Sequence, residues 1–234
     1  GILAIASSLV LVGCQAPPAM HQGQNRAIEF VQGRAGGEGL MFTLPPGYRR
    51  VKSGQLPGGI PFQTYLPAGE PEGSRRLFLE VMALPGAALS AKGVVTPEQI
   101  LMVSAKGMLN VGCPNTFNAS VLGPIQSALA TRQGPPPAPN APDFAVIIGC
   151  GRTSLGQSEV SLMASFRNGG DLFVLNWTER GAARDGGPVA LDQRLWLSRL
   201  RELQPLRLCE AAKGRSGPSD ACVLDMIGSI PTAP

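Results

Sequence analysis

The sequence predicts an α+β domain in which two helices cover an antiparallel sheet. Its 30 glycines and 22 prolines among 234 residues favour strands, turns and loops over a helical bundle. Apolar and polar residues alternate through residues 160–166 and again through 173–178, and the turn sequence between them is typical of a β-hairpin. Helix-start signals stand near residues 96 and 188.

Other strands are expected at intervals along the chain. They are residues 42–48, which run into a Pro-Gly turn, then 62–66, 77–84, 116–122 and 144–149, with a short edge strand at 206–208. The proline-rich residues 134–142 are expected to form a loop, because proline has no N–H to donate to a β-ladder. The hairpin has one polar side, so we expect the sheet to be covered on one face only.

The first helix has the clearer boundaries. Thr96 is suited to the N-cap, Pro97 to the first helical position, and Gln99 to the third position of a capping box. Gly112 and Pro114 are expected to end the helix.

The second helix is expected to open at Gly187 and Pro188 and to run to about Leu203. Its apolar stripe consists of Val189, Trp196, Leu200 and Leu203. Leu191 and Leu195 fall on the opposite side, where they either pack under a loop or offer a contact surface.

The order of these elements (strands, helix, strands, helix), together with residues 42–48, resembles the Mog1/PsbP-like fold over about residues 40–208. The resemblance implies an α/β sandwich with two helices over the sheet. It also implies an accessory or assembly factor without catalysis.

Residues 1–13 are apolar, and Leu11-Val12-Gly13-Cys14 resembles the lipobox of bacterial lipoproteins. The resemblance implies cleavage before Cys14 and attachment of a diacylglycerol to its thiol. We therefore expect residues 1–13 to be a signal peptide, clipped at its start, and the protein to face the periplasm. By the same resemblance, Gln15 implies the outer membrane, because an Asp at this position would favour the inner membrane. The alternative is a buried N-terminal strand with a chance cysteine.

The domain organisation follows from composition. Residues 14–39 are rich in glycine, proline and glutamine and are expected to be a lipidated tether, although Ile28, Phe30 and Val31 would suit one short strand within it. The folded domain is expected over residues 40–208, and residues 209–234 form a closed loop and a tail.

Four cysteines remain after Cys14, and four cysteines allow three pairings. An even number in an exported chain predicts disulfides. We favour Cys113 with Cys150, and Cys209 with Cys222, because the second pair would close a polar loop that buries little. A zinc site is the alternative, but no CxxC spacing is present, so we expect no metal.

The residues for catalysis are sparse, and we expect neither an enzyme nor a cofactor. The single histidine, His21, lies in the tether, where no rigid scaffold holds it near a nucleophile. The remaining catalytic alternative is a hydrolase with two facing carboxylates drawn from Asp143, Glu159, Asp171, Glu179 and Asp185.

We therefore predict a lipid-anchored accessory protein that binds or stabilises an envelope protein complex. Tyr48, Arg49 and Arg50 are the predicted partner contacts. The alternative is a carrier of a lipid or small lipophilic ligand, with a pocket near Met82, Met102, Met108 or Met163. The net charge of +4 suits anionic headgroups or acidic partners. Nucleic acid is not expected, because aromatic residues make up only 5% of the chain.

Overall fold

The structure, a computed structural model, describes residues 26–34, 37–73, 75–94, 96–113, 115–129, 143–167, 170–184, 186–214 and 217–229. The predictions for Cys14, His21, Asp185 and the proline-rich loop lie outside these residues.

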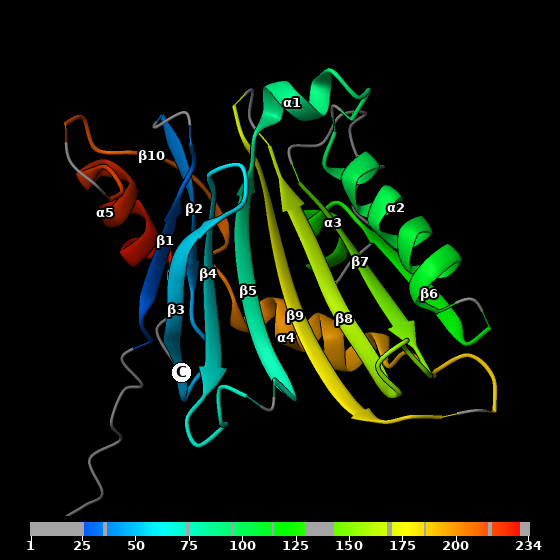
Figure 1. The fold of residues 1–234 in the computed structure, drawn as a ribbon. Coiled ribbons are helices and arrows are strands. Elements are labelled where there is room, and N and C mark those ends of the chain that lie inside the picture. The colour runs from blue at the N-terminus through cyan, green and yellow to red at the C-terminus, as the bar shows by residue number, and fades with distance from the viewer. Residues whose placement is uncertain are drawn as a thin grey trace, which may run out of the picture.

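A seven-stranded antiparallel sheet forms the centre of the domain (Figure 1). Its strands, in spatial order, are β3 (Tyr48–Leu56), β4 (Ile60–Pro67), β5 (Leu77–Leu84), β9 (Leu172–Ala182), β8 (Gln157–Phe166), β7 (Asp143–Cys150) and β6 (Phe117–Gly123). The predicted hairpin is β8 and β9, paired from Phe166 with Phe173 to Gln157 with Ala182. β3 was not predicted, because this edge strand is largely exposed and lacks apolar alternation.

A second, three-stranded sheet packs beside the first, in the order β1 (Ile28–Gln32), β2 (Glu38–Thr43) and β10 (Arg207–Glu210). The expected start of the domain at residue 40 is therefore too late. Ile28 pairs with Thr43, and Val31 and Leu40 are buried in the main core. Burial of these apolar side chains holds this glycine-rich segment in the fold. The predicted edge strand at 206–208 corresponds to β10, which pairs only with β2.

The first predicted helix is α2 (Pro97–Gly107), which continues as a π-helical turn, η1 (Met108–Gly112). Its predicted capping box is present: the Gln99 N–H donates to Thr96 Oγ1 at 3.2 Å, and the Thr96 N–H donates to Gln99 Oε1 at 3.0 Å. The second helix, α4 (Gln193–Glu202), begins later than expected. Asp192 is its N-cap and accepts the Leu195 N–H at 3.1 Å, so residues 187–191 precede the helix.

Three further helices were not predicted: α1 (Gly86–Ser90), α3 (Ile125–Leu129) and α5 (Asp220–Ser229). Among the described residues no helix is long and apolar enough to span a membrane.

The two main helices cover opposite faces of the large sheet, so the expectation of one covered face is wrong. α2 packs on β7 and β8 through Ile100, Leu101 and Ala105. α4 packs on the other face through Trp196, Leu200 and Leu203, beside the three-stranded sheet. The polar side of the hairpin lies under α2, where its hydroxyls are satisfied internally. Ser161 and Thr178 are bonded at 2.8 Å, and Ser165 donates to the Pro97 carbonyl at 2.7 Å.

Both favoured disulfides form in the structure. Cys113, just after η1, joins Cys150 at the end of β7, with Cα atoms 5.7 Å apart. Cys209 of β10 joins Cys222 of α5, with Cα atoms 5.9 Å apart. The first bridge ties the end of α2 to the sheet, and the second holds α5 against the smaller sheet.

Candidate functional site

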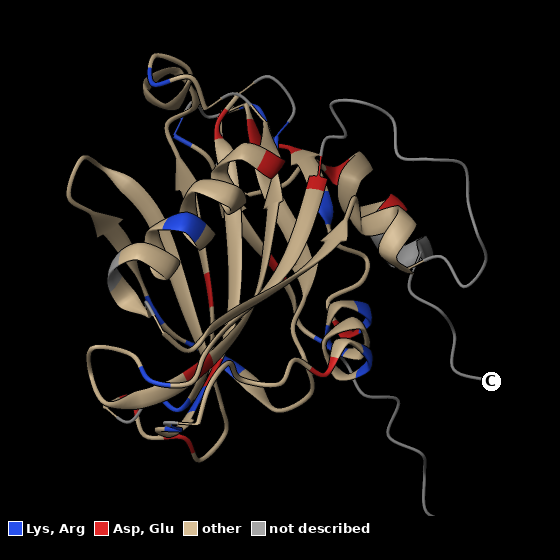
Figure 2. Ribbon diagram, turned by 90° about the vertical axis from the view of Figure 1, so that its right-hand side faces the viewer, with Lys and Arg blue, Asp and Glu red and all other residues tan. Residues whose placement is uncertain are grey.

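One end of the seven-stranded sheet is rich in arginine. Here β3 and β5 begin while β4 and β9 end, since Tyr48 pairs with Pro67 and Leu77 pairs with Glu179. We call the arginines of these strand ends and adjoining turns the arginine end. They are Arg49, Arg50, Arg75, Arg76, Arg152, Arg180 and Arg184. Figure 2 shows basic and acidic residues interspersed at this end, which is the lower end in that view.

In three ion pairs at the arginine end, the arginine side chain is more exposed to solvent than its carboxylate partner. The side-chain exposures are 50% for Arg50 against 15% for Glu29, 74% for Arg76 against 10% for Glu70, and 24% for Arg180 against 14% for Glu159. The pair of Glu179 and Arg199, beside the end of β9, has the reverse arrangement, with side-chain exposures of 51% for Glu179 and 14% for Arg199. Each pair also anchors its arginine to the fold.

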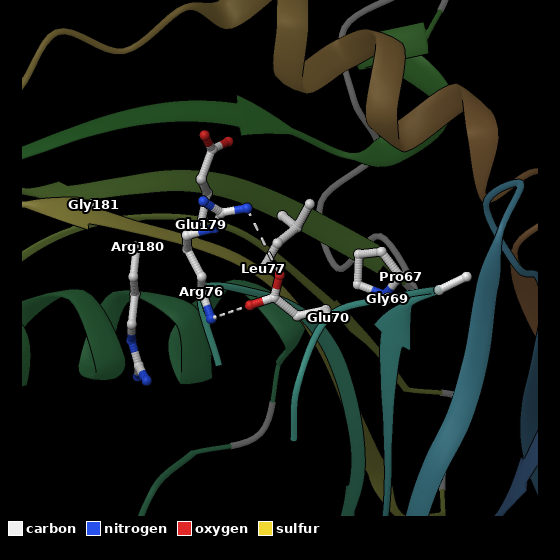
Figure 3. Close-up of a pocket in the computed structure, with 9 residues that line it drawn as sticks. Pro67, Gly69, Glu70, Arg76, Leu77, Glu179, Arg180 and Gly181 are labelled. Atoms are coloured by element: carbon white, nitrogen blue, oxygen red, sulfur yellow. Dashed lines mark hydrogen bonds and ion pairs between the residues drawn. The ribbon is translucent and has the colours of Figure 1, made fainter. Parts of the chain in front are cut away.

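A hollow of about 600 Å³ lies between the ends of β4, β5 and β9 (Figure 3). Arg76 and Glu70 line it and are joined twice, by the backbone N–H of Arg76 at 3.2 Å and by the ion pair at 3.8 Å. Glu179 and Arg180 extend to opposite sides of β9 (Figure 3). They also line a second hollow of about 300 Å³ beside the start of α4.

Tyr48 is held by a cluster of aromatic rings and an arginine. Its hydroxyl accepts the Trp177 indole N–H at 2.9 Å, and the two rings meet edge to face with centroids 5.5 Å apart. The Arg199 guanidinium lies 4.2 Å from the Trp196 ring centroid and donates to Glu179 at 2.7 Å. Burial raises the pKa of Tyr48 to about 12, although the Trp177 bond and Arg199 act against the shift.

This pKa predicts an alkaline titration that can be observed directly, because the chain has only two tyrosines. Burial also raises the pKa of Tyr65, whose hydroxyl donates to Glu29. We expect no phenolate absorbance near pH 10 in the folded protein. The unfolded chain loses these protons near pH 10 while the folded chain keeps them. The resulting contribution to stability is complete below about pH 10 and falls as pH rises towards 12. Phenolate absorbance appearing at pH 10 without unfolding would show that Tyr48 and Tyr65 are accessible.

The predicted partner contacts thus divide into two kinds. Arg49 is exposed, and half of the Arg50 side chain is exposed while it pairs with Glu29 at 3.4 Å. Tyr48 is half-buried, and its hydroxyl is engaged within the fold. Whether these residues meet a partner stays a prediction.

The carboxylates proposed for a hydrolase do not form a facing pair among the described residues. Glu159 is paired opposite Arg180 in the sheet and bound to it at 2.7 Å, whereas Glu179 lies on the other face of β9 with Arg199. Asp143 accepts the Ile125 N–H at 2.8 Å at the start of α3, and burial raises its pKa. Asp171 lines a separate hollow of about 610 Å³. No described group of three His, Cys, Asp or Glu residues is arranged to hold a metal.

Three of the four methionines considered for a ligand pocket are partly buried beside the core. Met82, Met108 and Met163 pack against the apolar cluster under α2, as core-filling residues do. Met102 faces solvent. None of the three hollows described above contains any of these methionines in its lining.

An exposed apolar surface lies on the α2 side of the molecule. Met102, Val103 and Leu109 on the outer side of the helix, and Val121 on the edge strand β6, are between 41% and 57% exposed. Within α2, η1 and β6 only Glu98 and Lys106 are charged, and Figure 2 shows this side with little colour. We call these four residues the α2 patch. The sequence pattern alone does not identify this surface. The helix also has apolar residues on its buried face, so the pattern does not tell which apolar residues stay exposed.

The molecule is an α+β sandwich built on a large antiparallel sheet. The sequence matches no family model and shows no significant similarity to a curated protein. Among solved structures it is similar to the Ran-binding protein Mog1p of Saccharomyces cerevisiae, at 14% identity and a TM-score of 0.37, over 77% of this chain and 86% of that one. It is also similar to LpqN of Mycobacterium tuberculosis, described as involved in cell envelope biogenesis. There the identity is 10% and the TM-score 0.32, over 79% of this chain and 91% of that one. Neither likeness assigns a function.

Proposed function

We propose that this chain is a lipid-anchored, non-catalytic protein of the cell envelope that binds a protein partner through the α2 patch. The observation that carries the proposal is the exposure of Met102, Val103 and Leu109 on an otherwise firmly packed helix. Exposed apolar groups on a side with few charges are typical of protein-binding surfaces, because their burial on binding is favourable.

The position of α2 in the fold is held at both of its ends and along its inner face. The capping box starts α2, its inner face is buried on β7 and β8, and the Cys113–Cys150 bridge follows η1. A rigid helix loses little conformational entropy when a partner covers it. The edge strand β6, next to β7 in the sheet, adds Val121 to the same surface.

The anchor in this proposal is a diacylglycerol on Cys14, supported by the resemblance of residues 11–14 to a lipobox. A lipid-anchored domain searches a surface instead of a volume, so weak protein contacts reach useful occupancy. The proposed role is therefore to bind and stabilise a larger envelope complex in the outer membrane, the location that Gln15 favours.

Co-purification from native membranes in mild detergent tests the binding role. We expect the wild-type chain to retain one protein in stoichiometric amount. The double variant Met102→Glu/Val103→Glu is expected to lose it, because two charges would be desolvated at the interface. Both positions are exposed, and a glutamate placed four residues before Lys106 favours the helix.

Leu224→Glu is the matched control, since Leu224 is also an exposed apolar residue, on α5. It should retain the partner. Retention of the same protein by the double variant would contradict the proposed surface, and a lone chain carrying a small molecule would favour the carrier function.

A further inference from the structure

We propose that the arginine end faces the bilayer, where its guanidinium groups bind anionic lipid headgroups and Leu155 inserts between them. This inference rests on the proposed lipid anchor at Cys14 and adds an orientation to it. It concerns a different surface from the α2 patch.

The chain that leads from Cys14 enters the fold at this end. Ala27 accepts the Leu44 N–H at 2.8 Å, and Arg26 donates to the Glu202 carbonyl at 3.4 Å. Leu44 opens the turn to Tyr48, where β3 begins. Eleven residues separate Cys14 from Arg26, and such a segment spans at most about 40 Å when fully extended. A lipid on Cys14 therefore holds the arginine end within about 40 Å of the membrane surface.

The charge of this end fits an anionic surface. In the three ion pairs described above the carboxylates of Glu29, Glu70 and Glu159 are the inner members, so their guanidinium groups lie nearer to solvent. Glu179 is the exposed member of its own pair. Arg49 and Arg184 add exposed guanidinium groups at the start of β3 and after β9. Arginine binds phosphate through two parallel N–H donors and is more weakly hydrated than lysine, which suits it to a phosphate layer.

An apolar side chain projects from the same end. Leu155, 75% exposed, has the highest exposure of the large apolar residues described. It lies in the turn between β7 and β8, which is closed by the Gly156 N–H to the Thr153 carbonyl at 2.9 Å and by the Thr153 N–H to the Gln157 carbonyl at 2.8 Å. The Arg184 N–H donates to the Gly151 carbonyl at 2.7 Å, so the turn lies beside the arginines. A leucine among arginines is the composition of an interfacial membrane contact.

Vesicle binding tests the inference without the anchor. The chain is made from residue 15 onwards, which keeps every residue that the structure describes and removes Cys14. We expect it to co-sediment with vesicles of phosphatidylglycerol and phosphatidylcholine in equal parts, and not with phosphatidylcholine alone. Binding should weaken as salt rises, because exposed charges are screened.

Two variants probe the two contacts. Arg49→Gln/Arg76→Gln/Arg184→Gln should lower vesicle affinity about a hundredfold, because each basic residue at an anionic surface contributes severalfold. Leu155→Ser should lower it about tenfold by removing the apolar insertion. The matched control is Arg34→Gln/Lys92→Gln/Lys213→Gln, which removes the same charge from exposed residues at the opposite end of the strands and should bind almost as wild type.

Equal binding by the two triple variants, or equal binding to both kinds of vesicle, would overturn the inference. A second contradicting result would come from co-purification. If the triple arginine variant bound vesicles as wild type but lost an acidic protein that the wild-type chain retains, the arginine end would bind a protein and not lipid. Failure of the anchor or of the α2 patch leaves these results unaffected, since the vesicle assay contains neither the lipid on Cys14 nor a protein partner.

Discussion

Replacing Cys14 by Ser is expected to move the protein from the membrane fraction to the soluble fraction. Each methylene buried in the bilayer contributes about 0.8 kcal/mol, so loss of the acyl chains removes the largest contribution to membrane retention. The measurement is fractionation of cells followed by a high-salt wash, which also removes the electrostatic contact of the arginine end.

The wild-type chain should resist the salt wash and be released only by detergent. A matched control, Cys209→Ser/Cys222→Ser, removes two cysteines but keeps Cys14 and should remain in the membrane fraction. Retention of the Cys14→Ser chain after the salt wash would rule out the lipid anchor.

Removing the Cys113–Cys150 bridge is expected to lower the free energy of unfolding by about 4 kcal/mol. The bridge joins residues 37 apart in sequence, and the entropy that it removes from the unfolded chain grows with loop length. The bridge between Cys209 and Cys222 closes a separation of 13, for which the same relation gives about 3 kcal/mol. Urea unfolding of Cys113→Ala/Cys150→Ala and of Cys209→Ala/Cys222→Ala measures both losses.

The packing around the Cys113–Cys150 bridge increases the loss of stability expected when the bridge is removed. Both sulfur atoms are buried, and Thr116 Oγ1 lies 3.1 Å from the Cys113 sulfur. The double Ala variant therefore also leaves a small cavity where α2 meets β6 and β7. An unchanged urea midpoint in this variant would mean that the bridge does not constrain the chain.

Patterns confined to a few neighbouring residues allowed the central elements to be predicted. The alternation in residues 160–166 and 173–178 predicted the hairpin, and Thr96 with Gln99 predicted the start of α2. These features depend on local hydrogen bonds and on the side-chain period of two in a strand. The order of strands, helix, strands and helix was sufficient to predict the α+β class.

The predictions that were wrong concern features that depend on contacts between segments far apart in the sequence. Residues 28–39 look like a tether by composition, yet β2 is held between β1 and β10, a strand from the far end of the chain. Ser161 and Ser165 look solvent-facing, but α2 supplies a cover and a carbonyl acceptor for Ser165. Proline suits the first turn of a helix and favoured a start at residue 188, whereas the structure uses the Asp192 carboxylate as the cap.

The candidate surfaces were predicted only in part. The expected partner contacts of Arg49 and Arg50 stay a prediction, and the structure places five further arginines at the same end of the sheet. The antiparallel register brings strand ends together that lie far apart in sequence, so no local pattern could have revealed this grouping. The α2 patch likewise requires knowledge of which helix face the sheet covers.

Photocrosslinking in living cells tests the proposed partner-binding role most directly. A photoreactive residue is placed at Met102 in the α2 patch, or at Leu224 on α5 as the exposed apolar control. We predict one discrete protein adduct in the membrane fraction from position 102 and none from position 224. No adduct from either position, or the same adduct from both, would contradict binding of an envelope partner through the α2 patch.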